Sequence, residues 1–369
     1  MLKPRSPEQH EFDHVVEFLN HQLRADSTWP INSEYPTALT PSNMHNMSII
    51  TEEGATPEQQ KIISHALIKP IVTKTPYAIY KLGAIGSVVT DPSHRQQGLS
   101  TLNMQNCLAK ATAQDCDLVI LWTDKTEFYQ KFGFELAGSE NTYVFTEPQT
   151  QRTENTRFVK GTQVDPQAIL KLYSQHSVGS LRSIDDIQQY LKIPNSNVYT
   201  AWSSSNQLLA YAIDGKGADL QSFIHEWGGQ VDALIDLVSH MVKTEHKSYH
   251  LMVPDHSTNL RKTLNDLEIF CHRGFLAMLR IHNFEAIAMK VKRAFRAEGL
   301  DQIILEKQHG QIVFGYGQDL YTLDQEADLA KILFGPTSID EMTFIKPETR
   351  EILGAILPMP LWVWGWDSI

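Results

Sequence analysis

The hydrophobic and polar positions along the chain alternate between two periodicities. The run from Ile79 to Thr90 is rich in β-branched and aromatic residues and ends at Asp91-Pro92, which predicts a strand closed by a proline. From Leu99 the apolar residues recur at the spacing of an amphipathic helix, which predicts a helix that ends near Gln114. The residues between them are therefore expected to form a polar loop that leads from a strand into a helix.

The same periodicities predict further elements throughout the chain. Helices are expected over residues 7–23, 126–132, 165–176, 184–191, 231–243 and 325–333. Strands are expected over residues 47–51, 62–74, 118–122, 142–146, 198–202, 207–213, 220–227, 303–306, 311–315 and 320–323. Residues 278–295 combine the pattern of a strand with that of a following helix. Since helices and strands are interspersed, the predicted fold class is α/β with mixed α+β character.

The length of the chain predicts more than one domain, because 369 residues exceed one ordinary domain. Residues 147–156 are polar and lack periodicity, which predicts a linker. Beyond this linker the expected elements repeat the order of the first unit from its hairpin onward, and a small α+β segment follows. We therefore expect three domains, at residues 1–148, 155–282 and 283–369.

The loop after the strand predicted at Ile79 to Thr90 has the features of a phosphate-binding turn. It reads Arg-Gln-Gln-Gly-Leu-Ser over residues 95–100. Backbone N–H groups at the start of a helix are unpaired and carry the positive end of the helix dipole, so they suit a pyrophosphate. Gly98 lets the backbone approach an anion closely, and Arg95 can add a charge-assisted hydrogen bond. A glycine in such a turn can also serve chain geometry alone, and the residues by themselves leave that alternative open.

A second motif lies at residues 128–134 and reads Phe-Tyr-Gln-Lys-Phe-Gly-Phe. A helix that ends at Gly133 is ordinary capping chemistry, and the aromatic side chains could belong to the core. Tyr129 could therefore be a structural tyrosine, and the motif gains meaning only from its distance to the first loop.

Together the two motifs resemble those of the GNAT superfamily of N-acetyltransferases. In that family the coenzyme A pyrophosphate loop reads Gln/Arg-x-x-Gly-x-Gly/Ala after a strand, and here Ser100 replaces the usual final residue. The second GNAT signature places a tyrosine beside the thioester sulfur, and Tyr129 is the match. Two GNAT-like units followed by a sterol-carrier-like α+β module resemble, over essentially the whole chain, the enhanced intracellular survival (Eis) family.

This resemblance implies an acetyl-CoA-dependent N-acetyltransferase that uses no metal. The pyrophosphate would lie on the loop and the pantetheine along the preceding strand, where an N–H near Val88 would polarise the thioester carbonyl. The coenzyme-binding residues implied are Val88, Val89, Thr90, Arg95, Gln96, Gln97, Gly98, Leu99 and Ser100.

The catalytic residues implied by the resemblance are Tyr129 and Ile369. Tyr129 would protonate the leaving thiolate, and the α-carboxylate of the last residue, Ile369, would accept the proton of the amine. The apolar tail at 361–366 contains three tryptophans and is expected to be buried, which supports a terminus inside the protein. His94 is the alternative base, although a histidine in a polar loop is usually only solvated.

The second GNAT-like unit is expected to lack a coenzyme site. Its strand-to-helix turn is predicted at residues 225–230, where Glu226 would repel a pyrophosphate. We expect this unit to be structural or to shape the acceptor site.

Composition limits the partners and the compartment. The net charge of −11 disfavours nucleic acid as a main partner and favours cationic substrates slightly. No apolar run is long enough for a membrane span, and the N-terminus lacks the apolar core of a signal peptide, so a cytoplasmic protein is expected. Three cysteines, Cys107, Cys116 and Cys271, have no metal-ligand spacing and are expected to be reduced and buried.

Three functions remain open on the sequence. The first is an N-acetyltransferase that acetylates an amine of a small cationic molecule, and the resemblance also implies a homo-oligomer. The second is a protein-lysine acetyltransferase, which would expose a wide acidic groove. The third is a non-catalytic acyl-CoA-binding scaffold, against which the intact Arg95, Gly98 and Tyr129 argue.

Overall fold

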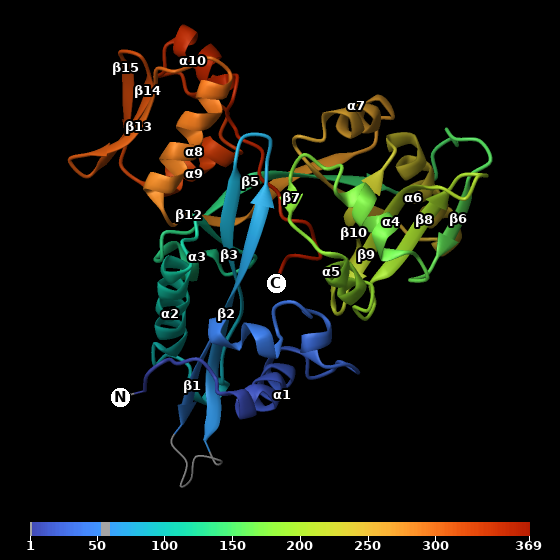
Figure 1. The fold of residues 1–369 in the computed structure, drawn as a ribbon, viewed down its shortest axis with the longest axis horizontal. Helices are drawn as coiled ribbons and strands as arrows, with labels where there is room; N and C mark the ends of the chain where they lie inside the picture. The colour runs from blue at the N-terminus through green and yellow to red at the C-terminus, as the bar shows by residue number, and fades with distance from the viewer. Residues whose placement is uncertain (1, 53–59) are drawn as a thin grey trace.

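The computed structural model describes residues 2–52 and 60–369 (Figure 1). Within these residues, twelve strands join in one long mixed sheet and three more form a small antiparallel sheet, with helices packed against both. The predicted α/β fold class with mixed character is confirmed.

The first unit contains the predicted strand, loop and helix in succession. Strands β1, β2 and β3 pair antiparallel, and β4 joins β3 in parallel after the crossover through α2. The predicted strand at Ile79–Thr90 and the predicted helix start at Leu99 are confirmed. The elements of this unit are α1 (Phe12–Leu23), β1 (Met47–Glu52), β2 (Lys61–Lys74), β3 (Ile79–Thr90), α2 (Leu99–Ala113), β4 (Leu118–Leu121), α3 (Thr126–Gln130) and β5 (Glu135–Phe145).

A bulge in β3 opens the sheet beside β4. Gly86 pairs with Leu67 of β2, whereas Val89 pairs with His65, so two residues of β3 lie opposite one residue of β2. Ser87, the first of the two, has a left-handed φ of 51°. Strand β4 pairs with β3 only over residues 82–84, before the bulge. The two parallel strands therefore separate at the point where β3 changes register.

Strands that are more than 100 residues apart in sequence are neighbours in the long sheet. Strand β12 (Cys271–Ile281) lies between β4 and β5, and β5 pairs on its other side with β11 (Tyr249–Pro254). The predicted strands at 142–146 and from 278 are therefore too short, because residues 135–141 and 271–277 pair mainly with each other. Their local sequence, which includes Gly138, Ser139 and Gly274, gives little strand signal by itself.

The second unit continues the same sheet through β10, β9, β8 and β6. The turn predicted at residues 225–230 is wrong at residues 225–229, because β10 extends through Gly229 by pairing with β9. Only Gln230 lies between β10 and α6. Strand β11 and helix α7 escaped the sequence prediction. The elements are β6 (Arg157–Lys160), α4 (Pro166–Tyr173), β7 (Gly179–Ser180), α5 (Ile184–Tyr190), β8 (Asn197–Trp202), β9 (Leu208–Lys216), β10 (Asp219–Gly229), α6 (Val231–Glu245), β11 and α7 (Thr258–Asp266).

The third segment packs on the first unit through α9, which contacts β5 and β12 (Figure 1). Helix α10 was not predicted from the sequence. The elements are α8 (Phe284–Ala297), β13 (Ile303–Gln308), β14 (Gln311–Tyr316), β15 (Asp319–Leu323), α9 (Glu326–Phe334) and α10 (Pro347–Gly354).

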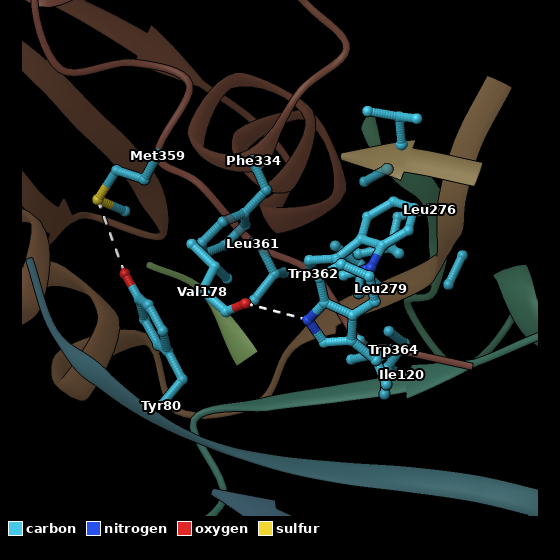
Figure 2. Close-up of a cluster of buried hydrophobic side chains, with 14 of the residues drawn as sticks. Tyr80, Ile120, Val178, Leu276, Leu279, Phe334, Met359, Leu361, Trp362 and Trp364 are labelled. Carbon is cyan, nitrogen blue, oxygen red and sulfur yellow. Dashed lines mark hydrogen bonds between the residues drawn. The ribbon is translucent and has the colours of Figure 1, made fainter. Parts of the chain in front are cut away.

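The C-terminal tail leaves α10 and runs back into the middle of the molecule (Figure 1). The three tail tryptophans are at most 1% exposed, so the predicted burial of the tail is confirmed. Trp362 and Trp364 pack in the large core, where Trp364 donates a hydrogen bond to the carbonyl of Val178 at 3.1 Å (Figure 2). Trp366 instead belongs to the core of the second unit and stacks on Tyr190. The tail therefore ties the units of the chain together.

Candidate active site

A cavity of about 440 Å³ opens where β3 and β4 separate. Its walls come from the β3 bulge, the end of β4, helix α3, the second unit and the C-terminal tail. Lining residues that matter for the chemistry below are Arg24, Tyr35, Gly86, Val88, Asp124, Tyr129, Glu140, Lys216, Asp219, His225, Ser368 and Ile369.

Tyr129 lies on the short helix α3 and lines this cavity. Its ring packs edge-on against Phe128 and Phe134, with centroid distances of 4.9 and 6.2 Å. Burial, together with the negative charge of Asp124, raises the pKa of the Tyr129 phenol to about 12. The phenol therefore keeps its proton at neutral pH, so its hydroxyl is available as a hydrogen-bond donor in the cavity.

Ile369 lines the same cavity as Tyr129. The carboxyl carbon of Ile369 lies 3.0 Å from the position that a Cβ on Gly86 would occupy. The terminal carboxyl group thus lies directly against the β3 bulge, and it can do so because residue 86 has no side chain. The resemblance implies that Tyr129 and the terminal carboxylate act in one reaction, and both residues line one cavity. The role of the carboxylate in catalysis remains a prediction.

The loop at residues 95–100 borders a second cavity of about 280 Å³. Gly98 has a φ of 76°, and a Cβ there would meet no atom within 4 Å, so the loop is open on this side. Helix α2 begins at the next residue, and its first N–H groups are free of intrahelical partners. The residues around this cavity are Thr90, His94, Arg95, Gln96, Gly98, Leu99, Ser100, Thr101, Phe128 and Lys131.

Ser100 has a function in the loop beyond its small size. Its hydroxyl forms a hydrogen bond of 2.8 Å with the hydroxyl of Thr90, which in turn lies 2.8 Å from the hydroxyl of Ser64. Asn103, fully buried on α2, donates to Ser64 at 2.9 Å. This buried network fixes the start of α2 to the last residue of β3 and to Ser64 of β2. The hydrogen bonds therefore stabilise the geometry of the loop between β3 and α2.

The predicted coenzyme residues divide between the two cavities. Val88 lines the larger one, whereas Thr90 and most of the loop residues line the smaller one. Val89 packs into the core beside α1. Gln97 lies in the loop and is exposed, but it is not among the residues that line either cavity.

His94, the alternative base, lies on the loop side and lines the smaller cavity. Its imidazole faces the carboxylates of Asp91 and Glu52 at 3.7 and 3.6 Å. It is not among the residues that line the larger cavity with Tyr129. The terminal carboxylate is therefore better placed than His94 to receive a proton there.

Lys131 borders the smaller cavity and is not among the coenzyme-binding residues that the resemblance implies. Its ammonium group lies 4.1 Å from the centre of the Phe128 ring. Lys131 belongs to the second motif, at residues 128–134, where the sequence pattern gives it no role other than to end a helix. Together with Arg95 it gives the loop two cationic side chains, and both can face a pyrophosphate.

Acidic groups surround the larger cavity. Burial raises the pKa of Glu140 to about 7. Asp219 accepts hydrogen bonds from Tyr35 at 2.5 Å and from Arg24 at 2.8 Å. Asp124 and the terminal carboxylate add further acidic groups, whereas three basic side chains line the same cavity and offset part of this charge: Arg24, Lys125 and Lys216. None of them carries a local sequence signal, since they come from separate elements.

Within the described residues, no cluster of three or more His, Cys, Asp or Glu side chains has the arrangement of a metal site. No helix in the described part of the chain is long and apolar enough to cross a membrane. The three cysteines are free thiols, of which Cys107 and Cys116 are buried and Cys271 is half-buried.

Comparison with known proteins gives a family match in the first unit. Residues 5–137 match the family model of the acetyltransferase (GNAT) domain. No curated protein sequence shows significant similarity to the chain.

Solved structures of similar fold cover the whole chain. Eis1 from Mycobacterium abscessus matches with a TM-score of 0.64 at 11% identity, and a GCN5-related N-acetyltransferase from Anabaena variabilis with 0.67 at 13%. A probable N-acyltransferase from Enterococcus faecalis matches with 0.63 at 14%. In each of the three pairs the alignment covers 100% of both chains.

Proposed function

We propose that this chain, which carries a GNAT acetyltransferase domain at residues 5–137, transfers the acetyl group of acetyl-CoA directly to an amine of a small cationic acceptor. The observation that carries the proposal is that Tyr129 and Ile369 line one cavity, at the opening between β3 and β4. The anion-binding loop stands at the far end of the same strand, β3.

The smaller cavity would hold the pyrophosphate of acetyl-CoA. The first N–H groups of α2 would receive it, and Arg95 and Lys131 would neutralise its charge. The pantetheine would follow the part of β3 beyond the bulge, which has no pairing with β4. Acetyl-CoA would supply the activated acyl group, so no metal is needed.

The larger cavity would hold the amine. A neutral amine nitrogen attacks the thioester carbonyl, a C–N bond forms and the C–S bond breaks. The carboxylate of Ile369 takes the proton from the amine nitrogen, directly or through a water molecule, and the phenol of Tyr129 gives its proton to the departing sulfur. Both groups return to their starting states when they exchange protons with solvent.

The lining of the cavity favours a small cationic acceptor over a protein lysine. The tail, the second unit and the first unit all contribute walls, and this enclosure leaves little room for a polypeptide. Asp124 and Glu140 supply acceptors for additional ammonium groups on the same molecule, whereas Asp219 already accepts hydrogen bonds from Arg24 and Tyr35. A homo-oligomeric cytoplasmic enzyme with domains at 1–148, 155–282 and 283–369 completes the proposal.

The test is an extension of the terminus by two glycines after Ile369. The extension moves the carboxylate by up to about 7 Å and preserves every side chain. Release of free thiol from acetyl-CoA is measured first with the natural chain across small diamines, aminosugars and lysine peptides. With the best acceptor, the extended chain should lose turnover by about 10²-fold or more, whereas acetyl-CoA binding by calorimetry stays within a few-fold.

Three outcomes would contradict parts of the proposal. Full activity in the extended chain would mean that water or a side chain, and not the terminal carboxylate, accepts the proton of the amine. Acetylation of peptides alone would favour the protein-lysine enzyme. Binding of acetyl-CoA without thiol release for any acceptor would favour the non-catalytic scaffold.

A further inference from the structure

The last residues of the chain are held by a buried ion pair. Asp367 is 3% exposed and accepts hydrogen bonds from Arg182, at 3.0 Å from Nε and at 2.7 Å from Nη2. The two terminal nitrogens of Arg182 also donate to both carboxylate oxygens of Glu226 at 2.9 Å. One guanidinium group thus joins the tail to β10.

Further groups fix the orientation of the Asp367 carboxylate. Tyr190 donates to its Oδ1 at 3.0 Å, and Ser180 donates to its Oδ2. Burial opposes ionisation of this carboxyl group, yet the charges of Arg182 and Lys69 hold its pKa at about 2. The side chain is therefore an anion with a partner at each oxygen.

A buried lysine amino group, whose pKa burial lowers to about 7, holds the backbone of the same segment. Lys216, at the end of β9, donates from Nζ to the carbonyls of Gly365, Trp366 and Ser368 at 2.8, 3.3 and 2.5 Å. The side chain of Lys216 is 1% exposed. Residues 365–368 are thus fixed from two sides, and Ile369 alone follows the last of these contacts.

We propose that Arg182 and Lys216 are positioning residues, which hold residues 365–368 so that the carboxylate of Ile369 stands at a defined point in the larger cavity. This inference rests on the proposed function of that carboxylate. Each residue of chain spans less than about 4 Å, so fixing Asp367 and the carbonyl of Ser368 leaves the terminal carboxylate only a small range of positions.

The energetics also favour a positioning role over simple stabilisation. Removing charged groups from water costs several kcal/mol for each ion, so a buried ion pair adds little net stability compared with apolar side chains. Trp362 and Trp364, which precede this segment in the tail, are already buried and supply the hydrophobic contribution to the stability of the tail. The charged groups add geometric definition for the final residues, where a base must lie within hydrogen-bond reach of the amine.

A matched pair of variants separates positioning from general stability. Asp367→Asn and Glu226→Gln each remove one negative charge from the same guanidinium group of Arg182, but only Asp367 belongs to the tail. We expect Asp367→Asn to lower kcat about 10- to 100-fold with an unchanged KM for acetyl-CoA, and Glu226→Gln to leave kcat within about threefold. Equal losses of kcat in the two variants would show a merely structural cluster.

Removal of Ile369 by a carboxypeptidase, followed by mass spectrometry, tests the position of the tail without any enzymatic assay. Asp367→Asn should release Ile369 at least about tenfold faster than the natural chain, and Glu226→Gln at nearly the natural rate. Because this readout needs no acceptor, it remains decisive even where no acetylation is found. Unchanged release of Ile369 from Asp367→Asn would overturn the positioning role of Arg182.

Lys216 provides the second, independent test. Lys216→Met should speed the release of Ile369 and lower kcat, and Lys216→Arg, which keeps the cation and its donors, should recover at least about half of both effects. The pair also covers the case in which Asp367→Asn fails to fold. Equal behaviour of the Met and Arg variants would reject the role of the Lys216 charge.

Discussion

The carboxyl carbon of Ile369 lies 3.0 Å from the point where a Cβ on Gly86 would stand. The last residue of the chain thus meets the β3 bulge, at the wall of the cavity that Tyr129 also lines. This contact brings the main-chain carboxylate, a group that every protein has, to the cavity in which the proposed reaction requires a base.

Gly86→Ala should displace the terminus. The added methyl group would lie 3.0 to 3.2 Å from three atoms of Ile369, so the last residue must shift by a few tenths of an ångström. We expect turnover to fall about 3- to 30-fold while the thermal midpoint changes little. The control is Gly274→Ala on β12, where a Cβ meets no atom within 4 Å and activity should be unchanged. Equal activity of the two variants would show that the contact is irrelevant.

Tyr129→Phe should slow the chemical step. The substitution keeps the ring and its contacts with Phe128 and Phe134 but removes the acid, so kcat should fall about 10² to 10⁴-fold with nearly natural affinity for acetyl-CoA. Tyr80→Phe is the matched control, since Tyr80 is buried and its hydroxyl faces the sulfur of Met359. Turnover within a few-fold of natural would make Tyr129 a core residue.

Substitutions at Gly98 should separate the charge effect from the backbone effect. Asn tolerates the left-handed φ of 76° and Asp has nearly the same shape, and neither would clash because the site is open. Gly98→Asn should weaken acetyl-CoA binding by no more than about tenfold, and Gly98→Asp should weaken it by at least a further factor of about ten through repulsion of the phosphates. Calorimetry measures both. Equal affinities of the two variants for acetyl-CoA would show that the pyrophosphate does not bind at this loop.

Lys131→Gln should weaken acetyl-CoA binding about 3- to 10-fold, because one of two cationic side chains at the smaller cavity is lost. The salt dependence of binding should fall at the same time, since fewer charges contact the coenzyme. Lys125→Gln serves as the control, because Lys125 lines the larger cavity instead. A loss of affinity confined to Lys125→Gln would place the pyrophosphate elsewhere.

Stability should decrease in acid because several histidines are buried as neutral groups, and His65 and His225 are the most deeply buried of them. Burial lowers the pKa of His65 to about 4 and that of His225 to about 3. The unfolded chain binds protons at these residues below about pH 6.5 whereas the folded chain does not, so the unfolding free energy falls as pH decreases from 6.5 toward 4. The two groups can add up to about 2.7 kcal/mol per pH unit to this slope.

Urea unfolding between pH 7.5 and 4.5 measures the slope. His225→Gln should reduce it, because glutamine binds no proton in either state. The expected reduction is up to about 1.4 kcal/mol per pH unit. A slope that is the same in the natural chain and the variant would exclude His225 as a source of the acid sensitivity.

Local sequence sufficed for the parts of the site that are contiguous in the chain. The strand at Ile79–Thr90, the loop at 95–100 and the helix from Leu99 are neighbours in sequence and in space. Their periodicity, glycine and proline therefore predict their geometry directly. The motif around Tyr129 also lies within one short segment, and its tyrosine lines the larger cavity. Ser100 was located correctly, but its hydrogen bond to Thr90 became visible only in the structure.

Tertiary structure decided how the distant segments combine. The sequence predicts a turn at Glu226. In the structure β10 extends past Glu226, and the carboxylate of Glu226 is buried against Arg182. Strand β12 lies between β4 and β5, a pairing that no local propensity encodes, since strand partners are chosen by packing of the whole sheet.

The sequence by itself thus determined most of the elements, the strand, loop and helix at residues 79–113, and the burial of an apolar tail. Only the fold decided that residues 365–368 meet Lys216 and Arg182, and that Ile369 reaches Gly86. The physical reason is that hydrophobic periodicity reports which face of an element is buried, but not against which partner. Contacts between residues more than 100 positions apart depend on the folded chain as a whole.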